Sequence, residues 1–254
     1  MKLYDLSEPW STNPNVENWV PETWYQTGGE RAVINAKTLG IEPSDFRDSW
    51  ALQGMGFKAN MAFHIGCHAD APRHFGQYCA GEPSRTIDQL PIEWFYSDGV
   101  ILDLRHKEPR SGITVEDIKK ALAEINYTLK PLDIVFIMTG YDKYRDNEHY
   151  LKDQPGMTGE ATGWIIDQGV KVIGIDCYTF DRPFGAMADD VRAGNKENLF
   201  PAHFIGRDKE YVHIEKLCDL DTVPVCHGFI ACVFPTKVKD GDAGYVRAVA
   251  IVNE

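Results

Sequence analysis

The chain has 254 residues, enough for one large domain or two small ones and for a core of substantial size. Hydrophobic residues make up 43% of it and charged residues 25%, which is ordinary for a folded globular protein. Acidic residues outnumber basic ones by 38 to 26, and the formal net charge is −12. Because nucleic-acid affinity rests largely on Lys and Arg, this balance argues against a nucleic-acid partner.

The sequence also argues against membrane association and disulfide bonding. No apolar run approaches the length of a membrane span, and the opening "MKLYDLSEPW" lacks the apolar stretch of a secretory signal. The six cysteines show neither CxxC spacing nor the density of a disulfide scaffold, so we expect reduced and mostly buried thiols. We therefore predict a cytoplasmic protein without a membrane partner.

Residues 9–29 carry three tryptophans, Trp10, Trp19 and Trp24, among several prolines and the pair Gly28-Gly29. The prolines and glycines predict an irregular segment. Polar loops seldom carry so much aromatic surface, so we expect this segment to pack against its own core, a subunit or a ligand.

The next notable stretch, "HIGCHADAPRH", covers residues 64–74 and holds His64, His68, Asp70 and His74, all at even positions. A strand would place the four on one face but would separate the first from the last by about 33 Å. An α-helix would bring only the first two together. The chain must therefore bend here, and Gly66 and Pro72 are residues that permit a bend.

This pattern favours a metal site over a group of hydrogen-bonded structural histidines. Imidazole nitrogens and carboxylate oxygens suit Zn²⁺, and also Mn²⁺ or Fe²⁺. We expect His64, His68 and Asp70 to be metal ligands. A nearby histidine that is not a ligand can move protons near neutral pH, and His74 is the candidate for that role.

From residue 98 onward, apolar runs alternate with amphipathic ones, which predicts an α/β fold on a mixed sheet. Thr114 can cap a helix, and Gly169 can end the next one. No boundary divides the chain, so we predict a single compact domain over residues 1–254. The predicted strands are 99–105, 133–140, 170–176, 229–238 and 244–252, the last two joined by a turn at 239–244, and the predicted helices are 114–125 and 158–169.

A second group of candidate ligands lies in "HFIGRDKEYVHIEKL". His203 and Glu215 are candidate metal ligands, and Glu215 lies in a strand-like run. His213 is an alternative to His203 as the histidine ligand. Upstream, "IDCYTFD" offers Cys177 as a nucleophile beside Asp176 and Asp181. Because no histidine is close in sequence, we expect Cys177 to be a buried thiol and Asp181 to fix a loop.

These residues resemble a known family. "HIGCHADAPRHF" resembles the HxGTHxDxPxHF signature of the metal-dependent cyclase hydrolases, which include bacterial kynurenine formamidase and isatin hydrolase. The likeness extends over most of the chain. It continues in "YDLSEP", "DIVFIMTGYDKY", "GMTGEATGWIIDQGVKVIGID" and "GFIACVFPTKVKDGDAGYVRAVAIV".

The resemblance implies roles for individual residues. His64, His68 and Asp70 would hold a first divalent ion, Mn²⁺ or Zn²⁺. In dinuclear members Asp70 would bridge to a second ion held by His203 and Glu215, giving one or two ions per chain. His74 corresponds to the catalytic histidine. His213 falls at a position the family leaves variable, which implies a structural role.

The resemblance also implies a cyclase-like swivelling β/β/α architecture. It implies homodimers or homotetramers in which N-terminal segments reach across, and a small-molecule substrate. Two features depart from the pattern: Cys67 replaces the usual Thr, and residues 9–60 are longer than in the compact formamidases and closer to the isatin-hydrolase type.

We therefore expect a hydrolase of a non-peptide C–N bond, in a cyclic amide or an aryl formamide. His74 would take a proton from the attacking water and pass it to the leaving nitrogen. A lactone or ester hydrolase and a cyclase or dehydratase remain alternatives on the same site. A non-catalytic metal- or ligand-binding module is the alternative of another class.

Overall fold

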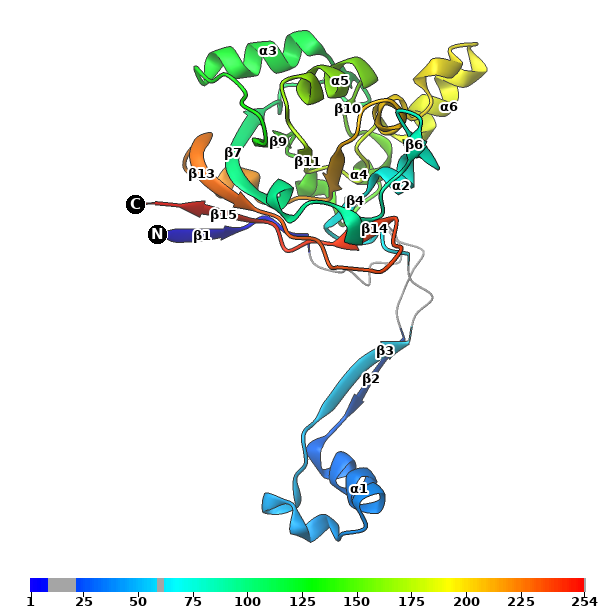
Figure 1. Ribbon diagram of the computed structural model, residues 1–254, viewed down its shortest axis with the longest axis vertical. Helices are drawn as coiled ribbons and strands as arrows, with labels where there is room; N and C mark the ends of the chain where they lie inside the picture. The colour runs from blue at the N-terminus through cyan, green and yellow to red at the C-terminus, as the bar shows by residue number, and fades with distance from the viewer. Residues whose placement is uncertain (9–21, 59–61, 254) are drawn as a thin grey trace. The chain divides into compact units, whose positions relative to one another are not determined.

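The computed structural model describes residues 1–8, 22–58 and 62–253, and its contacts divide the chain into two compact units (Figure 1). The larger unit comprises Met1–Ser11 and Phe63–Glu254, and the smaller comprises Thr12–Ala62. That residues 1–254 behave as a single domain stays a prediction.

A curled mixed sheet forms the centre of the larger unit (Figure 1). Its order is β1-β15-β13-β7-β9-β11-β12-β4-β14, with parallel pairing from β7 through β12 and antiparallel pairing elsewhere. The fold-class prediction is thus confirmed. The strands are β1 (Lys2–Asp5), β4 (His68–Asp70), β7 (Tyr96–Asp103), β9 (Ile134–Met138), β11 (Val172–Ile175), β12 (Val212–Glu215), β13 (His227–Cys232), β14 (Ala243–Tyr245) and β15 (Val249–Val252).

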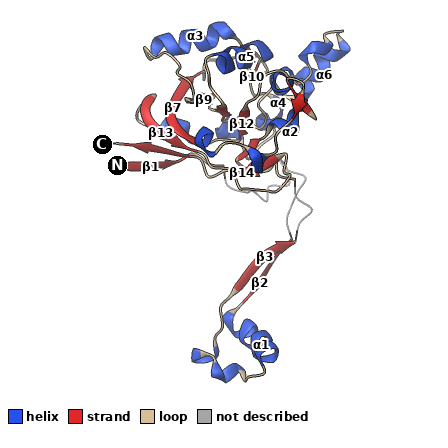
Figure 2. Cartoon of the chain, viewed as in Figure 1, coloured by secondary structure: helices blue, strands red, loops and turns tan. Residues whose placement is uncertain are grey.

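The parallel strands are buried on both faces, which explains their continuous apolar sequences. In β9 every residue is buried; Ile134 and Phe136 pack on one face, Val135 and Ile137 on the other. Helices α3 and α5 cover the second face, while the antiparallel strands of the curled sheet pack over the first (Figure 2).

The two long helices of this layer match the predicted ones. In α3 (Val115–Glu124), the Thr114 side chain accepts from the backbone N–H of Asp117, whose carboxylate accepts from the Thr114 N–H in return. Helix α5 (Gly159–Asp167) ends just before Gly169, whose φ of 90° lies in the left-handed region.

Shorter elements complete the larger unit. The helices are α2 (Pro72–Phe75), α4 (His149–Lys152), α6 (Phe184–Arg192) and α7 (Pro201–Phe204). Two-residue strands pair as β5 (Tyr78–Cys79) with β6 (Glu82–Pro83), and as β8 (Gly112–Ile113) with β10 (Gly156–Met157). Among the described residues, no helix is long and apolar enough to cross a membrane. All six cysteines are free thiols and four of them are buried, as predicted.

The predicted C-terminal hairpin is wrong in both strands: the first ends at Cys232 and not at residue 238, and the second is not continuous. Residues 244–252 do not form one strand but divide into β14 and β15, at different places in the sheet. The reason is that β14 hydrogen-bonds to β4, whereas β15 pairs with β13 and β1. One apolar run thereby serves two regions of the curled sheet.

The smaller unit corrects the prediction of an irregular segment over residues 9–29 in its described part, residues 22–29. Strand β2 (Glu22–Gln26) pairs antiparallel with β3 (Gly54–Lys58), and helix α1 (Gly28–Leu39) follows. Thr27 and Glu30 form a reciprocal cap, so Gly28 and Gly29 begin a helix instead of a loop. Residues 9–21, with Trp10 and Trp19, lie outside the described part of the chain.

Candidate active site

The stretch 64–74 bends as predicted. Gly66 has a φ of 57°, in the left-handed region that glycine adopts without strain, and it ends the turn that carries His64. The chain then enters β4 with His68 and Asp70, and Pro72 begins the short helix α2 that carries His74. Three elements thus place the four side chains around one point.

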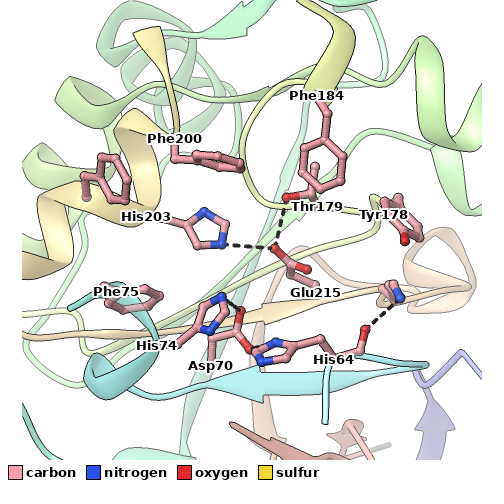
Figure 3. A pocket seen from close by; sticks show the side chains of 12 residues that line it. His64, Asp70, His74, Phe75, Tyr178, Thr179, Phe184, Phe200, His203 and Glu215 are labelled. Atoms are coloured by element: carbon pink, nitrogen blue, oxygen red, sulfur yellow. Dashed lines mark hydrogen bonds and ion pairs between the residues drawn. The ribbon is translucent and has the colours of Figure 1, made fainter. Parts of the chain in front are cut away.

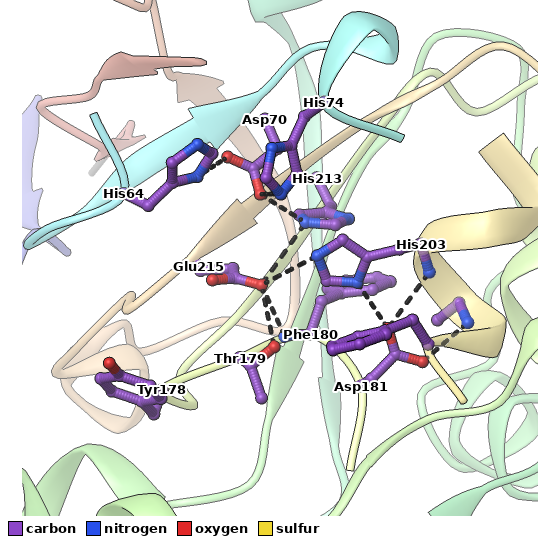
Figure 4. Close-up of polar contacts among 12 residues, drawn as sticks. His64, Asp70, His74, Tyr178, Thr179, Phe180, Asp181, His203, His213 and Glu215 are labelled. Atoms are coloured by element: carbon purple, nitrogen blue, oxygen red, sulfur yellow. Dashed lines mark hydrogen bonds and ion pairs between the residues drawn. The ribbon is translucent and has the colours of Figure 1, made fainter. Parts of the chain in front are cut away.

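Strand pairing brings the downstream residues to the same point. Strand β12 runs antiparallel to β4, with His213 opposite Asp70 and Glu215 opposite His68. Because alternate residues share a face of a sheet, all four side chains lie on one side. His203 joins them from α7 (Figure 4). All six predicted site residues therefore lie together in one pocket region.

One half of the cluster is formed by His64, His68 and one oxygen of each carboxylate. Asp70 Oδ1 lies 2.8 Å from His64 Nδ1 and 3.4 Å from His68 Nε2. The same His68 nitrogen is 3.6 Å from Glu215 Oε2. The donor atoms of His64, His68 and Asp70 are mutually close enough to hold one ion.

The other half uses the second oxygen of each carboxylate. His213 Nε2 lies 2.9 Å from Asp70 Oδ2 and 3.5 Å from Glu215 Oε1. His203 Nε2 lies 3.7 Å from the same Glu215 oxygen. These four residues are all buried, and their donor atoms lie within 4.8 Å of one another. Asp70 and Glu215 therefore face both halves.

Surrounding groups hold the cluster side chains in place. Asp181 is fully buried; its carboxylate accepts from the Nδ1 of His203 at 2.5 Å and from the backbone N–H of Ala202 at 2.7 Å. Glu215 Oε1 accepts from the N–H of Phe180 at 2.8 Å and from Thr179 Oγ1 at 3.2 Å. Such partners fix the orientation of ligand side chains.

Asp242 acts in the same way on the opposite side of the cluster. Its Oδ2 lies 3.2 Å from His64 Nε2 and 3.4 Å from His74 Nδ1. The other ring nitrogen of each histidine faces Asp70, at 2.8 Å for His64 and 3.9 Å for His74. One carboxylate thus orients both rings toward the cluster.

The pKa shifts differ among the cluster residues. Burial would lower the pKa of both His64 and His213, but their hydrogen bonds to neighbouring carboxylates raise it, to about 10 for His64 and about 9 for His213. The shifts of His68 and Glu215 instead favour the forms that bind a cation. Burial lowers the pKa of His68 to about 4, against the attraction of Asp70 and Glu215, so the imidazole is neutral at pH 7. Burial would raise the pKa of Glu215, but its hydrogen bond with His213 and nearby His68 lower it to about 2. Neutral imidazole and ionised carboxylate are the ligand forms of these groups.

A buried ring nitrogen without a hydrogen-bond partner supports a metal site here. His68 Nε2 is buried and has no hydrogen-bond partner, whereas Asp70 Oδ1 lies 2.8 Å from His64 Nδ1. An unpaired buried polar atom is costly, and His68 Nε2 lies 3.4 Å from Asp70 Oδ1. Ligand atoms around a tetrahedral ion stand roughly 3.3–3.6 Å apart, given bonds of about 2.0–2.2 Å. The donor set therefore fits a divalent ion.

A cavity of about 410 Å³ opens above the cluster. Aromatic rings form much of its wall, and His64, His74, His203 and both carboxylates face it (Figure 3). The aromatic lining residues are Phe75, Tyr178, Phe184, Phe200 and Phe204.

Sequence reasoning missed three features of this site. It assigned Asp181 only to a loop, whereas Asp181 also holds His203; Asp242 was not singled out at all. His213 was given a structural role, yet its Nε2 faces both carboxylates. The position of His213 two residues before Glu215 in a strand was the available signal. Cys177 is buried and away from the cavity lining, as expected.

Comparisons with known proteins agree with this fold. The kynurenine formamidase of Bacillus mycoides (strain KBAB4) is 24% identical over 214 residues, covering 83% of this chain and 88% of the relative. A solved isatin hydrolase bound to the product analogue thioisatinate has a TM-score of 0.72 at 22% identity, covering 100% of this chain and 93% of that one. A structure described as a potential metal-dependent hydrolase with cyclase activity has a TM-score of 0.59 at 19% identity, with coverages of 100% and 98%.

The family assignment rests on a match to a family model. The family model described as "Putative cyclase" matches residues 4–182, more than half of the chain. This range includes the first three predicted ligands and His74, while His203 and Glu215 lie beyond it. The fold comparison covers those two as well. The chain belongs to the cyclase family.

Proposed function

We propose that this protein is a metal-dependent hydrolase that cleaves a non-peptide C–N bond in a cyclic amide or an aryl formamide. The observation that carries the proposal is the cluster of histidines and carboxylates beneath an aromatic cavity, in which the buried His68 Nε2 has no hydrogen-bond partner. The relatives named kynurenine formamidase and isatin hydrolase support this choice of bond.

His64, His68, Asp70, His203 and Glu215 would hold one or two divalent ions. Mn²⁺ and Zn²⁺ both suit nitrogen and carboxylate ligands. When bound, such an ion polarises a carbonyl group and lowers the pKa of water, which supplies the nucleophile near neutral pH.

His74 is positioned to move the proton. Its Nδ1 lies 3.4 Å from the Asp242 carboxylate, which accepts an N–H but cannot donate one. That contact leaves the lone pair of His74 on Nε2, which faces Asp70 at 3.9 Å and so faces the cluster. His74 can take a proton from attacking water at Nε2 and deliver it to the leaving nitrogen.

The aromatic wall supports the choice of an aromatic substrate. Tyr178, Phe184 and Phe200 line one side of the cavity, opposite His74 and His64 (Figure 3). Flat apolar surfaces stack favourably on such rings and exclude water from the reacting group. A single-ring or fused-ring aromatic amide therefore fits best.

A substrate panel in ¹⁸O-labelled water tests the proposal. We expect turnover of N-formyl arylamines or isatin-type cyclic amides, with one ¹⁸O in the carboxylate product and loss of turnover after chelation. Turnover confined to lactones or esters would contradict the C–N assignment. Product formation without ¹⁸O would show cyclisation or dehydration. No turnover by protein carrying metal would favour a non-catalytic module.

A further inference from the structure

The function proposed above leaves His213 without a role, although its side chain lies inside the cluster. His213 is completely buried on β12, with its ring stacked on Phe180 at 4.4 Å between centroids and an angle of 11° (Figure 4). The stacking fixes the plane of the ring. Its two nitrogens therefore have defined and different surroundings.

The first nitrogen, Nδ1, faces the Tyr211 hydroxyl at 3.0 Å. That hydroxyl has one hydrogen, which it donates to the carbonyl oxygen of Ala202 at 2.6 Å. The Tyr211 oxygen must therefore accept from His213, and Nδ1 carries the proton. In the neutral ring the lone pair is then on Nε2.

The second nitrogen, Nε2, faces only acidic oxygens within the described cluster. It lies 2.9 Å from Asp70 Oδ2 and 3.5 Å from Glu215 Oε1. The first is a hydrogen-bonding distance, and the second lies within the roughly 3.3–3.6 Å expected between ligand atoms that share a tetrahedral ion. The His203 Nε2 completes the group at 3.7 Å from Glu215 Oε1.

With His213 included, the two halves of the cluster offer the same number and kinds of ligand atoms. His64 and His68 face Asp70 Oδ1 or Glu215 Oε2, while His203 and His213 face Asp70 Oδ2 or Glu215 Oε1. Each half then offers two imidazole nitrogens and two carboxylate oxygens. Without His213 the second half offers one nitrogen only.

We propose that His213 is a metal ligand through Nε2 and completes the second half of the cluster together with Asp70, His203 and Glu215. The inference rests on the metal-dependent function proposed above. In it, Tyr211 is a positioning residue, because its hydroxyl fixes which nitrogen of His213 faces the carboxylates.

Metal binding by the full chain tests the inference without reference to activity. Chelator-stripped wild type and His213→Asn are titrated with Zn²⁺ against a chromophoric competitor, and with Co²⁺ followed by its visible spectrum. Asn keeps a donor near the Nδ1 position and removes Nε2. We expect the affinity of one ion to fall by more than about a hundredfold, because losing a mere partner of a ligand already costs about 10- to 100-fold. The Co²⁺ spectrum of that ion should change.

Two comparators make the result interpretable. His227→Asn makes the same change at an exposed histidine on β13, and it should bind as wild type does. His203→Asn should resemble His213→Asn. Melting of each stripped protein checks that the variants are folded.

Wild-type affinity and spectrum in folded His213→Asn would overturn the inference while leaving the proposed function intact. If wild type takes up a single ion, the same comparison applies to that ion. If wild type binds no ion after reconstitution, the proposed function and this inference both fail.

Discussion

His74 is the residue on which the proposed proton transfer depends. Replacing it by Ala should lower kcat by about 10²- to 10⁴-fold, the usual contribution of a positioned acid or base. Its ring lies at the cavity, 31% exposed, so the substitution should leave metal content unchanged. Steady-state kinetics and elemental analysis measure the two quantities. Full turnover by His74→Ala with metal bound would refute the assigned role.

Asp242 should matter because one carboxylate orients both His64 and His74. We expect Asp242→Asn to lower metal affinity or kcat by about 10- to 100-fold, as partners of ligands do, with little change in KM. Asp240→Asn, at an exposed carboxylate two residues away, is the matched control. Equal kinetics and metal binding in the two variants would show that Asp242 has no positioning role.

The residues found from sequence were those with a local signal. His64, His68, Asp70 and His74 lie within eleven positions, and the required bend follows from their spacing. Asp242 is separated from His64 by 178 positions and from His74 by 168. Its place beside them depends on β14 pairing with β4, a long-range contact that no local pattern encodes.

At the scale of elements, the short strand β10 packs against the backbone of Asp181, the residue that holds His203. A Cβ at Gly156 would lie 2.2 Å from the backbone carbon of Asp181 and 2.3 Å from the Arg182 nitrogen. Backbone cannot move away cheaply, so Gly156→Ala should destabilise the fold by about 1–3 kcal/mol. It should also weaken metal binding at His203, which Asp181 holds.

Thermal melting and metal titration of Gly156→Ala check that prediction. Gly185→Ala is the matched control, because nothing lies within 4 Å of its added Cβ in helix α6. Alanine there should be neutral or stabilising by up to about 1 kcal/mol, since glycine is a poor helix former. Equal melting temperatures for both variants would contradict the packing argument.

The elements predicted well were those whose own sequence carries a cap or an apolar pattern. Helix α3 has an N-cap and a buried face of Ile118, Ala121 and Leu122, and β9 is apolar throughout. The division of residues 244–252 into β14 and β15 could not be foreseen, because both are apolar and extended. The two strands are distinct because they pair with different strands of the curled sheet.

At the scale of the whole molecule, assembly into homodimers or homotetramers is a prediction that the smaller unit makes testable. Its described part leaves Val33, Leu39 and Leu52 exposed at 61%, 63% and 86%. Contiguous exposed apolar patches are typical of interaction surfaces, so these residues are the place to test for one. We expect homodimers or homotetramers, and we expect the pair of substitutions Val33→Asp and Leu39→Asp to reduce the assembly size.

Sedimentation equilibrium at micromolar concentration measures this, with Lys37→Glu on the same helix as a charge-changing control. A monomeric wild type would contradict the expectation. An unchanged assembly in the double variant would place the interface elsewhere.

The central claim is that the cluster at β4 and β12 holds a catalytic metal ion. Elemental analysis of wild type and His68→Ala, each reconstituted with Zn²⁺ or Mn²⁺ and freed of excess, tests it most directly. His68 is fully buried, and its Nε2 has no hydrogen-bond partner. We predict one or two equivalents per wild-type chain and at least one fewer in folded His68→Ala. Wild type without bound metal, or equal metal in both proteins, would contradict the account.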